Sequence, residues 1–564
     1  MKESVKMKAR YACPKPIKVS RRKWPSRLLH QSPIWCAVDL RDGNQALPNP
    51  MTPVQKKRYF QLLVEIGFKE IEVGFPSASA DDFQFCRDLI EQNLIPDDVT
   101  ISVLTQAREH LIIKTIEALK GVRRGVIHVY AATSELHMRF VFNKTAEETK
   151  AMTLDAVRMI REKSLADLAG SEILLEFSPE EFTDTDLDFA VDICDSVIEA
   201  WQPKKGEKVI LNLPATVERR LPNQYADMIE EFMYRQKRGE QSIISLHAHN
   251  DMGSAVAATE MALLAGAHRV EGTLFGHGER CGNVDLITIV LNLQYLGVNT
   301  GLKFANIEKM RDELVELTGI GVHPRHPYAG ELVFTAFSGS HQDAIHKGLL
   351  NAAALTKHFG SWKVPYLHID PRDLGRSFEK FIRINSQSGK GGIAYVLQQE
   401  TGIHLPRPLL QEFSAAVQAF ADKAGREVDA HELSGILRAK YVLQDAPVRL
   451  LNYWPRPTAA DPTQIDGEVH VEFNGQAYTL QASAPGPIAA FVRAVQQLPL
   501  PFSFKLDEYE EDSIGADEEA EAVTFVKLSN SLGAMRYGIG FGVNIDQAAV
   551  RAIVSALNAL LAGK

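Results

Sequence analysis

Short apolar runs rich in β-branched residues alternate with longer stretches of helical spacing between residues 34 and 276. Each run is almost continuously apolar, as is typical of parallel strands covered by helices. The runs cover 34–40, 70–75, 100–105, 125–132, 172–178, 208–216, 242–250 and 268–276. Eight strand–helix units in about 250 residues predict a (β/α)₈ barrel, a TIM barrel, within 34–330. A doubly wound open α/β sheet is the alternative.

The alternation stops beyond about residue 330. Residues 331–446 are expected to form helical linker subdomains with polar loops, including the Gly- and Ser-rich segment 386–392. From 447 to 564 a pattern of strands followed by a helix occurs twice, with a hairpin near 468–483 and a last helix over 546–563. Such duplication is typical of a small α+β module. The nine acids of 507–521 predict a solvated loop, with a contact to a partner or cation as the alternative.

Composition narrows the class of protein. Of 564 residues, 45% are hydrophobic and 24% charged, which is ordinary for a soluble globular protein. The formal net charge of −9 argues against a dedicated nucleic-acid binder. Five scattered cysteines without a C-x-x-C pair fit a reducing compartment, and the absence of a long apolar run excludes a transmembrane helix. We therefore expect a cytoplasmic protein whose basic residues 1–33 form a surface arm; an organelle transit peptide is the alternative.

The most informative segment is 245–251, at the end of the seventh predicted strand. His247 and His249 are two residues apart, so their side chains point the same way into the mouth of a barrel. A lone buried histidine is more often structural, but catalytic groups gather at this end of barrel strands. Asp42, after the first strand, can complete a two-histidine, one-carboxylate site for Zn²⁺, Mn²⁺ or Mg²⁺. Arg41 points to the opposite side if the strand continues, and either pairs across the rim or stabilises an oxyanion.

Polar side chains end several other predicted strands. They are His128, Ser178, Glu180 and Thr216, and together they make a site at one rim more probable than any of them alone. The long segment 133–145 could form a lid over that rim.

A glycine-rich turn, 276–283, follows the eighth strand. Turns of this kind after late barrel strands often bind phosphates, and this one opens into a helix near Asp285 whose N-terminus favours an anion.

Taken together, the segments LRDGNQ (40–45), SPE (178–180), SLHAHND (245–251) and GHGERCGN (276–283) resemble 2-isopropylmalate synthases. These enzymes belong to a superfamily of metal-dependent acyl-CoA Claisen enzymes built on a TIM barrel. The similarity continues through 338–348, 364–376 and 383–395 into the duplicated module, and so covers nearly the whole chain. The later segments look like the long form of fungi and actinobacteria, which favours this family over homocitrate and citramalate synthases.

The resemblance implies a role for each matching position. Asp42, His247 and His249 would bind the divalent metal; Arg41, His128, Ser178, Glu180 and Thr216 would surround the 2-oxo acid, with Asn283 beside both; His341 and Tyr366 would be catalytic; and Gly276, Gly278 and Gly282 would lie near acetyl-CoA. The post-barrel segment would reach the barrel of a second subunit, which implies a homodimer. The C-terminal module would bind leucine as a feedback inhibitor, with Gly486, Ile488 and Ala489 as expected contacts, unless these residues only pack a helix.

The implied reaction joins acetyl-CoA to 2-oxoisovalerate and then hydrolyses the thioester, with Glu180 and His341 as the acid–base pair in either order. A lyase or aldolase on the same barrel and a non-catalytic metabolite sensor are the alternatives. Several positions depart from the family pattern. Ala248, Met252, His277 and Cys281 concern the expected acetyl-CoA contacts, and the sequence 484–487 concerns the expected leucine site.

Overall fold

The computed structural model describes residues 14, 16–336, 339–376, 390–443, 445, 447–458, 461, 463–515 and 520–563. It divides into two compact units. The barrel unit is Met1–Val333 with Arg372–Arg376, and the C-terminal unit is Phe334–Pro371 with Ser377–Lys564. Among the described helices, none combines the length and apolar character that crossing a membrane requires.

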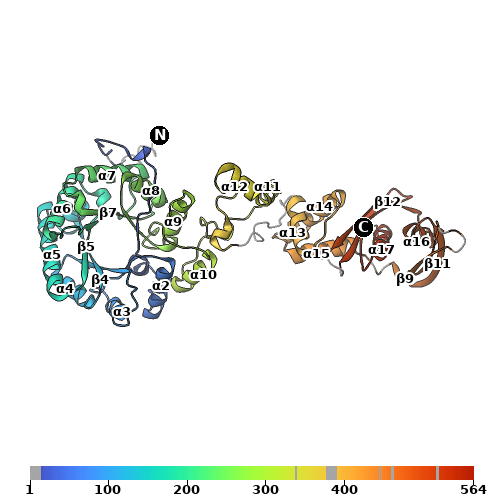
Figure 1. Cartoon of the computed structure of the whole chain (residues 1–564), viewed down its shortest axis with the longest axis horizontal. Coiled ribbons are helices and arrows are strands. Elements are labelled where there is room, and N and C mark those ends of the chain that lie inside the picture. The colour runs from blue at the N-terminus through green and yellow to red at the C-terminus, as the bar shows by residue number, and fades with distance from the viewer. Residues whose placement is uncertain are drawn as a thin grey trace, which may run out of the picture. The chain divides into compact units, whose positions relative to one another are not determined.

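Eight parallel strands close into a barrel in sequence order (Figure 1). The strands are β1 (Ile34–Ala37), β2 (Glu70–Gly74), β3 (Thr100–Gln106), β4 (Arg124–Ala132), β5 (Glu172–Glu180), β6 (Val209–Ala215), β7 (Ser242–Ala248) and β8 (Arg269–Gly272). Strand β1 pairs with both β2 and β8, so the sheet has no free edge. The predicted TIM barrel is confirmed, and the open-sheet alternative is wrong.

Helices follow the strands and form the outer ring of the barrel (Figure 1). They are α2 (Pro53–Ile66), α3 (Ala80–Glu91), α4 (Glu109–Ala118), α5 (Ala146–Asp167), α6 (Leu187–Trp201), α7 (Pro222–Arg235), α8 (Ala255–Ala265) and α9 (Leu286–Tyr295), with α10 (Ile307–Thr318) after them. Local sequence sets their ends: Thr52 and Gln55 form a capping box at the start of α2, and Gly67 ends it with a left-handed φ of 113°.

The described part of the N-terminal arm is tied to α7 and α8. Trp24 is buried and donates from Nε1 to Asp227 Oδ1 at 2.9 Å, and Arg22 donates from Nε to the same oxygen at 2.7 Å. Arg27 donates from Nη1 to the carbonyl oxygen of Ala265, at the end of α8, at 2.9 Å. The arm thus lies against the outer helices of the barrel, and its residues 16–18 reach the segments that follow β4 and β5.

The C-terminal unit begins with helices. These are α11 (Gly339–Leu350), α12 (Ala352–Phe359), α13 (Lys390–Thr401), α14 (Arg407–Ala424) and α15 (Ala430–Tyr441). Most of the Gly- and Ser-rich segment 386–392 lies outside the described residues, which resume at Lys390 with the start of α13. The expectation of helices and loops between the barrel and the module is confirmed for the described part.

The last region contains two three-stranded antiparallel sheets and two helices. The elements are β9 (Val448–Pro457), β10 (Ile465–Phe473), β11 (Gln476–Ala484), α16 (Pro487–Val495), β12 (Phe504–Ile514), β13 (Glu521–Asn530), β14 (Met535–Gly542) and α17 (Ile545–Leu561). Sequence reasoning missed β9, whose half-exposed residues and two prolines hide a strand pattern. With β9 included, each half of the duplication has three strands and one helix.

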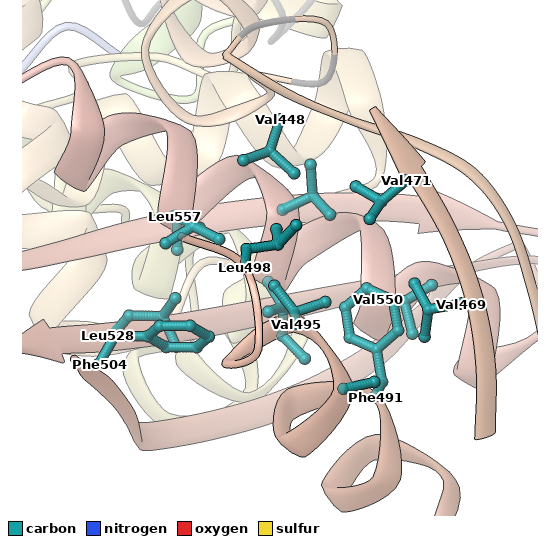
Figure 2. Close-up of a cluster of buried hydrophobic side chains, with 14 of the residues drawn as sticks. Val448, Val469, Val471, Phe491, Val495, Leu498, Phe504, Leu528, Val550 and Leu557 are labelled. Atoms are coloured by element: carbon teal, nitrogen blue, oxygen red, sulfur yellow. The ribbon is translucent and has the colours of Figure 1, made fainter. Parts of the chain in front are cut away.

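A single hydrophobic core joins the two halves of the module (Figure 2). Val469 of β10, Phe491 and Val495 of α16, and Val550 and Leu557 of α17 are all buried in it. The β12–β14 sheet has a second covered face, where buried residues of β13 and β14 pack against α13, α14 and α15.

The acidic run 507–521 corrects one sequence expectation. Residues 507–514 belong to strand β12, with exposed acidic side chains, rather than to a solvated loop. Residues 516–519 lie outside the described residues. The strand predicted over 502–512 is confirmed, and only the expectation of a loop for the acidic residues 507–514 is wrong.

Candidate metal centre and active site

Three predicted metal ligands meet at the C-terminal end of the barrel. Asp42, His247 and His249 are all buried and offer ligand atoms within 4.8 Å of one another. Asp42 Oδ2 lies 3.3 Å from His247 Nε2 and 3.4 Å from His249 Nε2. For ligands about 2.1 Å from a cation, neighbouring ligand atoms lie roughly 3.0–3.4 Å apart in octahedral or tetrahedral coordination. The spacing therefore fits one divalent ion.

Unsatisfied polar atoms support the same fit. Asp42 Oδ2 and both ring nitrogens of His249 are buried without a hydrogen-bond partner among the described residues. The backbone of Asn283 pairs with that of His249, and Asn283 Oδ1 is likewise buried and unpartnered. Buried polar atoms are normally satisfied, so this group of acceptors needs a cation or its bound ligands.

His247 is held from behind by a carboxylate that the sequence reasoning did not name. Its Nδ1 lies 2.8 Å from Oε2 of Glu271, on β8. Burial lowers the pKa of His247, but the neighbouring carboxylates of Asp42 and Glu271 outweigh it and raise the pKa to about 9. Arg269, also on β8 and fully buried, donates from Nη1 to Glu271 Oε1 at 2.6 Å.

Arg41 contradicts its predicted direction. Strand β1 ends at Ala37, and Asp39–Gly43 form a π-helical turn, so alternation along a strand no longer applies. Arg41 instead turns to its neighbour, donating from Nη1 to Asp42 Oδ1 at 2.6 Å, and its Nε donates to Glu72. Burial lowers the pKa of Arg41, but Asp42 and Glu72 raise it overall, so the guanidinium stays charged.

Two of the predicted polar strand ends, His128 and Ser178, belong to one hydrogen-bonded chain. His128 Nδ1 lies 2.7 Å from Glu72 Oε2, and its Nε2 lies 2.7 Å from Ser178 Oγ. Asn212 Nδ2 donates to Ser178 Oγ at 3.0 Å and to Glu271 Oε2 at 3.0 Å. His128 and Ser178, which are expected to contact a 2-oxo acid, are therefore linked to the carboxylate behind His247.

A cavity of about 250 Å³ opens above these groups. It is lined by the predicted residues Arg41, Asp42, His128, Ser178, Glu180, Thr216, His247 and His249, and by Gln45, Phe75, Leu104, Tyr130, Asn212, Pro214, Glu279 and Arg280. Burial raises the pKa of Glu180, against a lowering by His137, while Glu181 raises it further. The structure thus gathers eight predicted residues around one concave site.

The glycine turn 276–283 borders a second cavity of about 360 Å³, closed on its other side by α10 and the residues after it. Gly282 has a φ of 92°, and a Cβ there would collide with the carbonyl of Gly276. Phe275 and Arg280 also have positive φ, of 60° and 54°. Close folding of the turn on itself explains why glycine recurs there.

The helix N-terminus expected to favour an anion already holds one, the side chain of Asp285. The Asp285 carboxylate caps α9, accepting from the backbone N–H groups of Ile287 and Thr288 at 3.1 and 3.2 Å. His326 Nε2 also lies 2.9 Å from Asp285 Oδ2. Because a carboxylate already occupies these donors, a phosphate would have to use the turn itself.

The departures from the family pattern have local partners. The ring of His277 covers Gly43, where a Cβ would collide with it, and His277 Nδ1 lies 3.0 Å from the carbonyl oxygen of Leu274. Ala248 is buried, whereas Met252 and Cys281 are exposed.

Residues predicted after the barrel lie in the C-terminal unit. The rings of His341 and Tyr366 stack with centroids 3.9 Å apart at 23°. Tyr366 is exposed and has a φ of 61°, a strained conformation for a non-glycine residue. The two predicted catalytic residues thus form one pair.

The predicted effector residues lie at the start of α16. Gly486 is its N-cap, Ile488 packs against the module core, and Ala489 is exposed. Of these three residues, only Ile488 fits the alternative that they merely pack the helix against the core.

Glu72, Asn212, Glu271 and Arg269 were missed by sequence reasoning. Each is a polar residue inside an otherwise apolar, buried strand. An ionisable group buried in a strand needs a partner, so these interruptions were the available signal.

Comparisons with known protein families match most of the chain in three parts. A family model described as HMGL-like matches residues 32–314, one described as alpha-isopropylmalate synthase, post-catalytic domain-like, matches 331–398, and one described as LeuA allosteric (dimerisation) domain matches 427–561. A 2-isopropylmalate synthase of Acetoanaerobium sticklandii is 45% identical over 540 residues, which cover 96% of this chain and 94% of that one. That of Rhodospirillum rubrum is 46% identical over 545 residues (97% of each chain), and that of Pseudomonas syringae pv. syringae is 47% identical over 537 residues (95% and 94%).

Proposed function

The chain belongs to the 2-isopropylmalate synthase family and is an acyltransferase, and from this premise we propose that acetyl-CoA and 2-oxoisovalerate combine in the cavity at Asp42. The products are 2-isopropylmalate and CoA. The observation that carries the proposal is the convergence of Asp42, His247 and His249 below that cavity. Because the relatives align over nearly the whole chain, the lyase, citramalate, homocitrate and sensor alternatives lose their support.

We assign the metal to Asp42, His247 and His249, with Asn283 beside them. A divalent ion there supplies a Lewis acid that polarises the ketone of the 2-oxo acid. Mg²⁺, Mn²⁺ and Zn²⁺ all suit this ligand set.

Arg41 binds the oxygen on which negative charge develops when the ketone carbon is attacked. Its guanidinium is held by Glu72 and Asp42, so it needs little reorganisation during the reaction. The preceding step removes a proton from the methyl group of acetyl-CoA. Glu180 and His341 form the acid–base pair: one takes this proton, and the other delivers one to the new alkoxide. Water then attacks the thioester carbonyl, and CoA leaves as the thiol.

His128, Ser178 and Thr216 orient the 2-oxo acid from the opposite side of the cavity, and Tyr366 supports His341. The raised pKa of Glu180 supports its role, because a carboxylate titrating closer to neutrality is a better proton acceptor. Gly276, Gly278 and Gly282 provide the turn on which acetyl-CoA lies, beside the second cavity.

The cavity walls support a branched aliphatic substrate. Phe75, Leu104 and Pro214 give it an apolar side that fits an isopropyl group. Its two lining arginines are engaged: Arg41 with Asp42, and Arg280 with Asp251 at 2.7 Å. A substrate with a second carboxylate, such as 2-oxoglutarate, would lack a free cation among the described lining residues.

In this proposal the chain also forms a homodimer that leucine inhibits. Its domains are the N-terminal arm (1–33), the catalytic barrel (34–330), the linker subdomains (331–446) and the regulatory domain (447–564). The match to a domain described as allosteric and dimerising supports both features. Gly486, Ile488 and Ala489 are the proposed leucine contacts.

Thiol release from acetyl-CoA tests the function directly. We expect the highest kcat/KM with 2-oxoisovalerate, lower values with pyruvate and 2-oxoglutarate, and inhibition by leucine. Equal rates with pyruvate would indicate a citramalate synthase, and no thiol release with any 2-oxo acid would contradict the proposal.

A further inference from the structure

A closed ring of buried polar contacts runs through the barrel mouth. Starting at Asp42, it passes through Arg41, Glu72, His128, Ser178, Asn212 and Glu271 to His247, and returns to Asp42. It joins the proposed metal ligands to the proposed substrate groups. Glu271 and Asn212 are the members that complete it, and neither has a role in the proposed function above.

Glu271 is held by three nitrogen donors and by a hydrogen bond from the carboxyl group of Glu176. Oε1 receives Arg269 Nη1 at 2.6 Å, and Oε2 receives His247 Nδ1 at 2.8 Å and Asn212 Nδ2 at 3.0 Å. The Arg269 guanidinium and the Asn212 amide nitrogen can only donate, so both oxygens of Glu271 act as acceptors.

This arrangement decides which nitrogen of His247 can bind a metal. Because Glu271 only accepts, Nδ1 of His247 must carry the proton, and the lone pair of a neutral ring lies on Nε2. Nε2 is the atom that faces Asp42 Oδ2. His249 has no such support, since both its nitrogens lack hydrogen-bond partners among the described residues.

We propose that Glu271 is a positioning residue that presents His247 Nε2 to the divalent metal and is itself fixed by Arg269 and Asn212. The inference rests on the proposed metal site. Carboxylates behind metal-binding histidines fix the tautomer and ring orientation, and their loss typically weakens metal binding about 10–100-fold.

Two substitutions separate position from charge. Glu271→Asp keeps the negative charge but withdraws it by one methylene, and Glu271→Gln keeps the length but removes the charge. We expect both to weaken Mn²⁺ binding about 10–100-fold, and saturating Mn²⁺ to restore most of kcat. Restoration by metal distinguishes a positioning role from a general structural one.

Glu176→Gln is the matched control. Glu176 is as deeply buried as Glu271, contacts the same arginine, Arg269, at 3.1 Å and hydrogen-bonds Glu271, but has no hydrogen bond to His247. The amide of glutamine can still donate to Glu271. Burial holds the pKa of Glu176 well above its usual range, so glutamine resembles its neutral form. We expect its Mn²⁺ affinity to stay within about threefold of the wild type.

The measurement is a titration of metal-free full-length protein with Mn²⁺, followed by the electron paramagnetic resonance signal of free Mn²⁺, with circular dichroism of each variant as a folding check. Wild-type affinity in Glu271→Asp, or equal losses in Glu176→Gln, would overturn the inference. If Glu271→Gln fails to fold, Glu271→Asp decides, because it retains the ion pair with Arg269. The Asp42→Asn variant serves as the control that lacks a metal ligand and should not bind Mn²⁺. If the wild-type protein bound Mn²⁺ no better than this control, the proposed metal site itself would be refuted.

Discussion

Strand β14 and helix α17 approach so closely that only glycine fits at their contact. Gly538, Gly540 and Gly542 alternate along β14, and a Cβ added at Gly540 would lie less than 3.0 Å from backbone atoms of Ala548 and Ala552 of α17. Backbone atoms cannot rotate away as a side chain can. Gly540→Ala therefore forces the helix off the sheet.

Gly435 offers the opposite case in the same unit. It lies inside α15, and a Cβ there would meet nothing within 4 Å. Gly435→Ala should stabilise the unit by about 0.5–1 kcal/mol, because alanine loses less conformational entropy in a helix. Overpacking at Gly540 should cost about 1–3 kcal/mol. The same chemical change should thus have opposite signs at the two positions.

Differential scanning calorimetry with and without Mn²⁺ can assign the transitions. Mn²⁺ binds the native barrel and so raises only the transition of the barrel unit. For a unit of about 200 residues, each kcal/mol shifts Tm by roughly 2–4 °C. We expect Gly540→Ala to lower the Mn²⁺-insensitive Tm by roughly 2–12 °C, Gly435→Ala to raise it, and neither to change Mn²⁺ affinity. An unchanged Tm in Gly540→Ala, or a fall of the same size in Gly435→Ala, would refute the steric reasoning.

Three further predictions concern catalysis. Arg41→Lys should lower kcat about 10²–10³-fold, because lysine cannot contact Glu72 and the developing oxyanion in one fixed geometry; steady-state kinetics at saturating substrate and metal measure this. Glu180→Gln should lower kcat about 10²–10⁴-fold, yet raise the free energy of unfolding at pH 8. Because the pKa of Glu180 is raised in the folded protein, its ionised form destabilises the folded state at pH values above that pKa. The stability gained by Glu180→Gln should therefore vanish below about pH 4, where the carboxyl group is protonated in both the folded and the unfolded state. Urea unfolding of both proteins at the two pH values measures this difference. If each active site uses both subunits of a dimer, mixing inactive Asp42→Asn and His341→Ala chains should restore up to about a quarter of wild-type activity, because about half of the dimers are mixed and each has one intact site. If mixing restores no thiol release, His341 and the metal act within one chain.

Much of the fold was predictable because parallel barrel strands leave a strong pattern. Near-continuous apolar runs, regularly spaced and separated by helices capped with glycine, determine a (β/α)₈ barrel with little ambiguity. Two of the metal ligands were predictable for a related reason: His247 lies near the end of β7 and His249 directly follows that strand in extended backbone, so local geometry alone makes them neighbours. Strand β9 escaped because its half-exposed residues give no clear alternation.

The direction of Arg41 could not be predicted, because a strand pattern does not reveal where the backbone leaves the sheet. The π-helical turn Asp39–Gly43 swings Arg41 beside Asp42, and only the three-dimensional structure shows that Glu72 of the next strand receives it. Asp285 is similar: its position before a helix predicts an anion site, but its own carboxylate fills that site. Contacts between segments distant in sequence decided both cases.

The buried ring also limits what single substitutions can reveal about this site. Each described member from Glu72 to Glu271 has polar neighbours on both sides, and removing one leaves buried partners unsatisfied, which costs about 1–3 kcal/mol for each neutral group and more for charged groups. A loss of activity on changing Ser178 therefore includes the displacement of His128 and Asn212, which it joins. Substitutions of residues that act as a unit have non-additive effects. The rate of one variant therefore does not show whether a residue contacts the substrate or supports the metal. Combined substitutions and measurements of metal affinity separate these two roles.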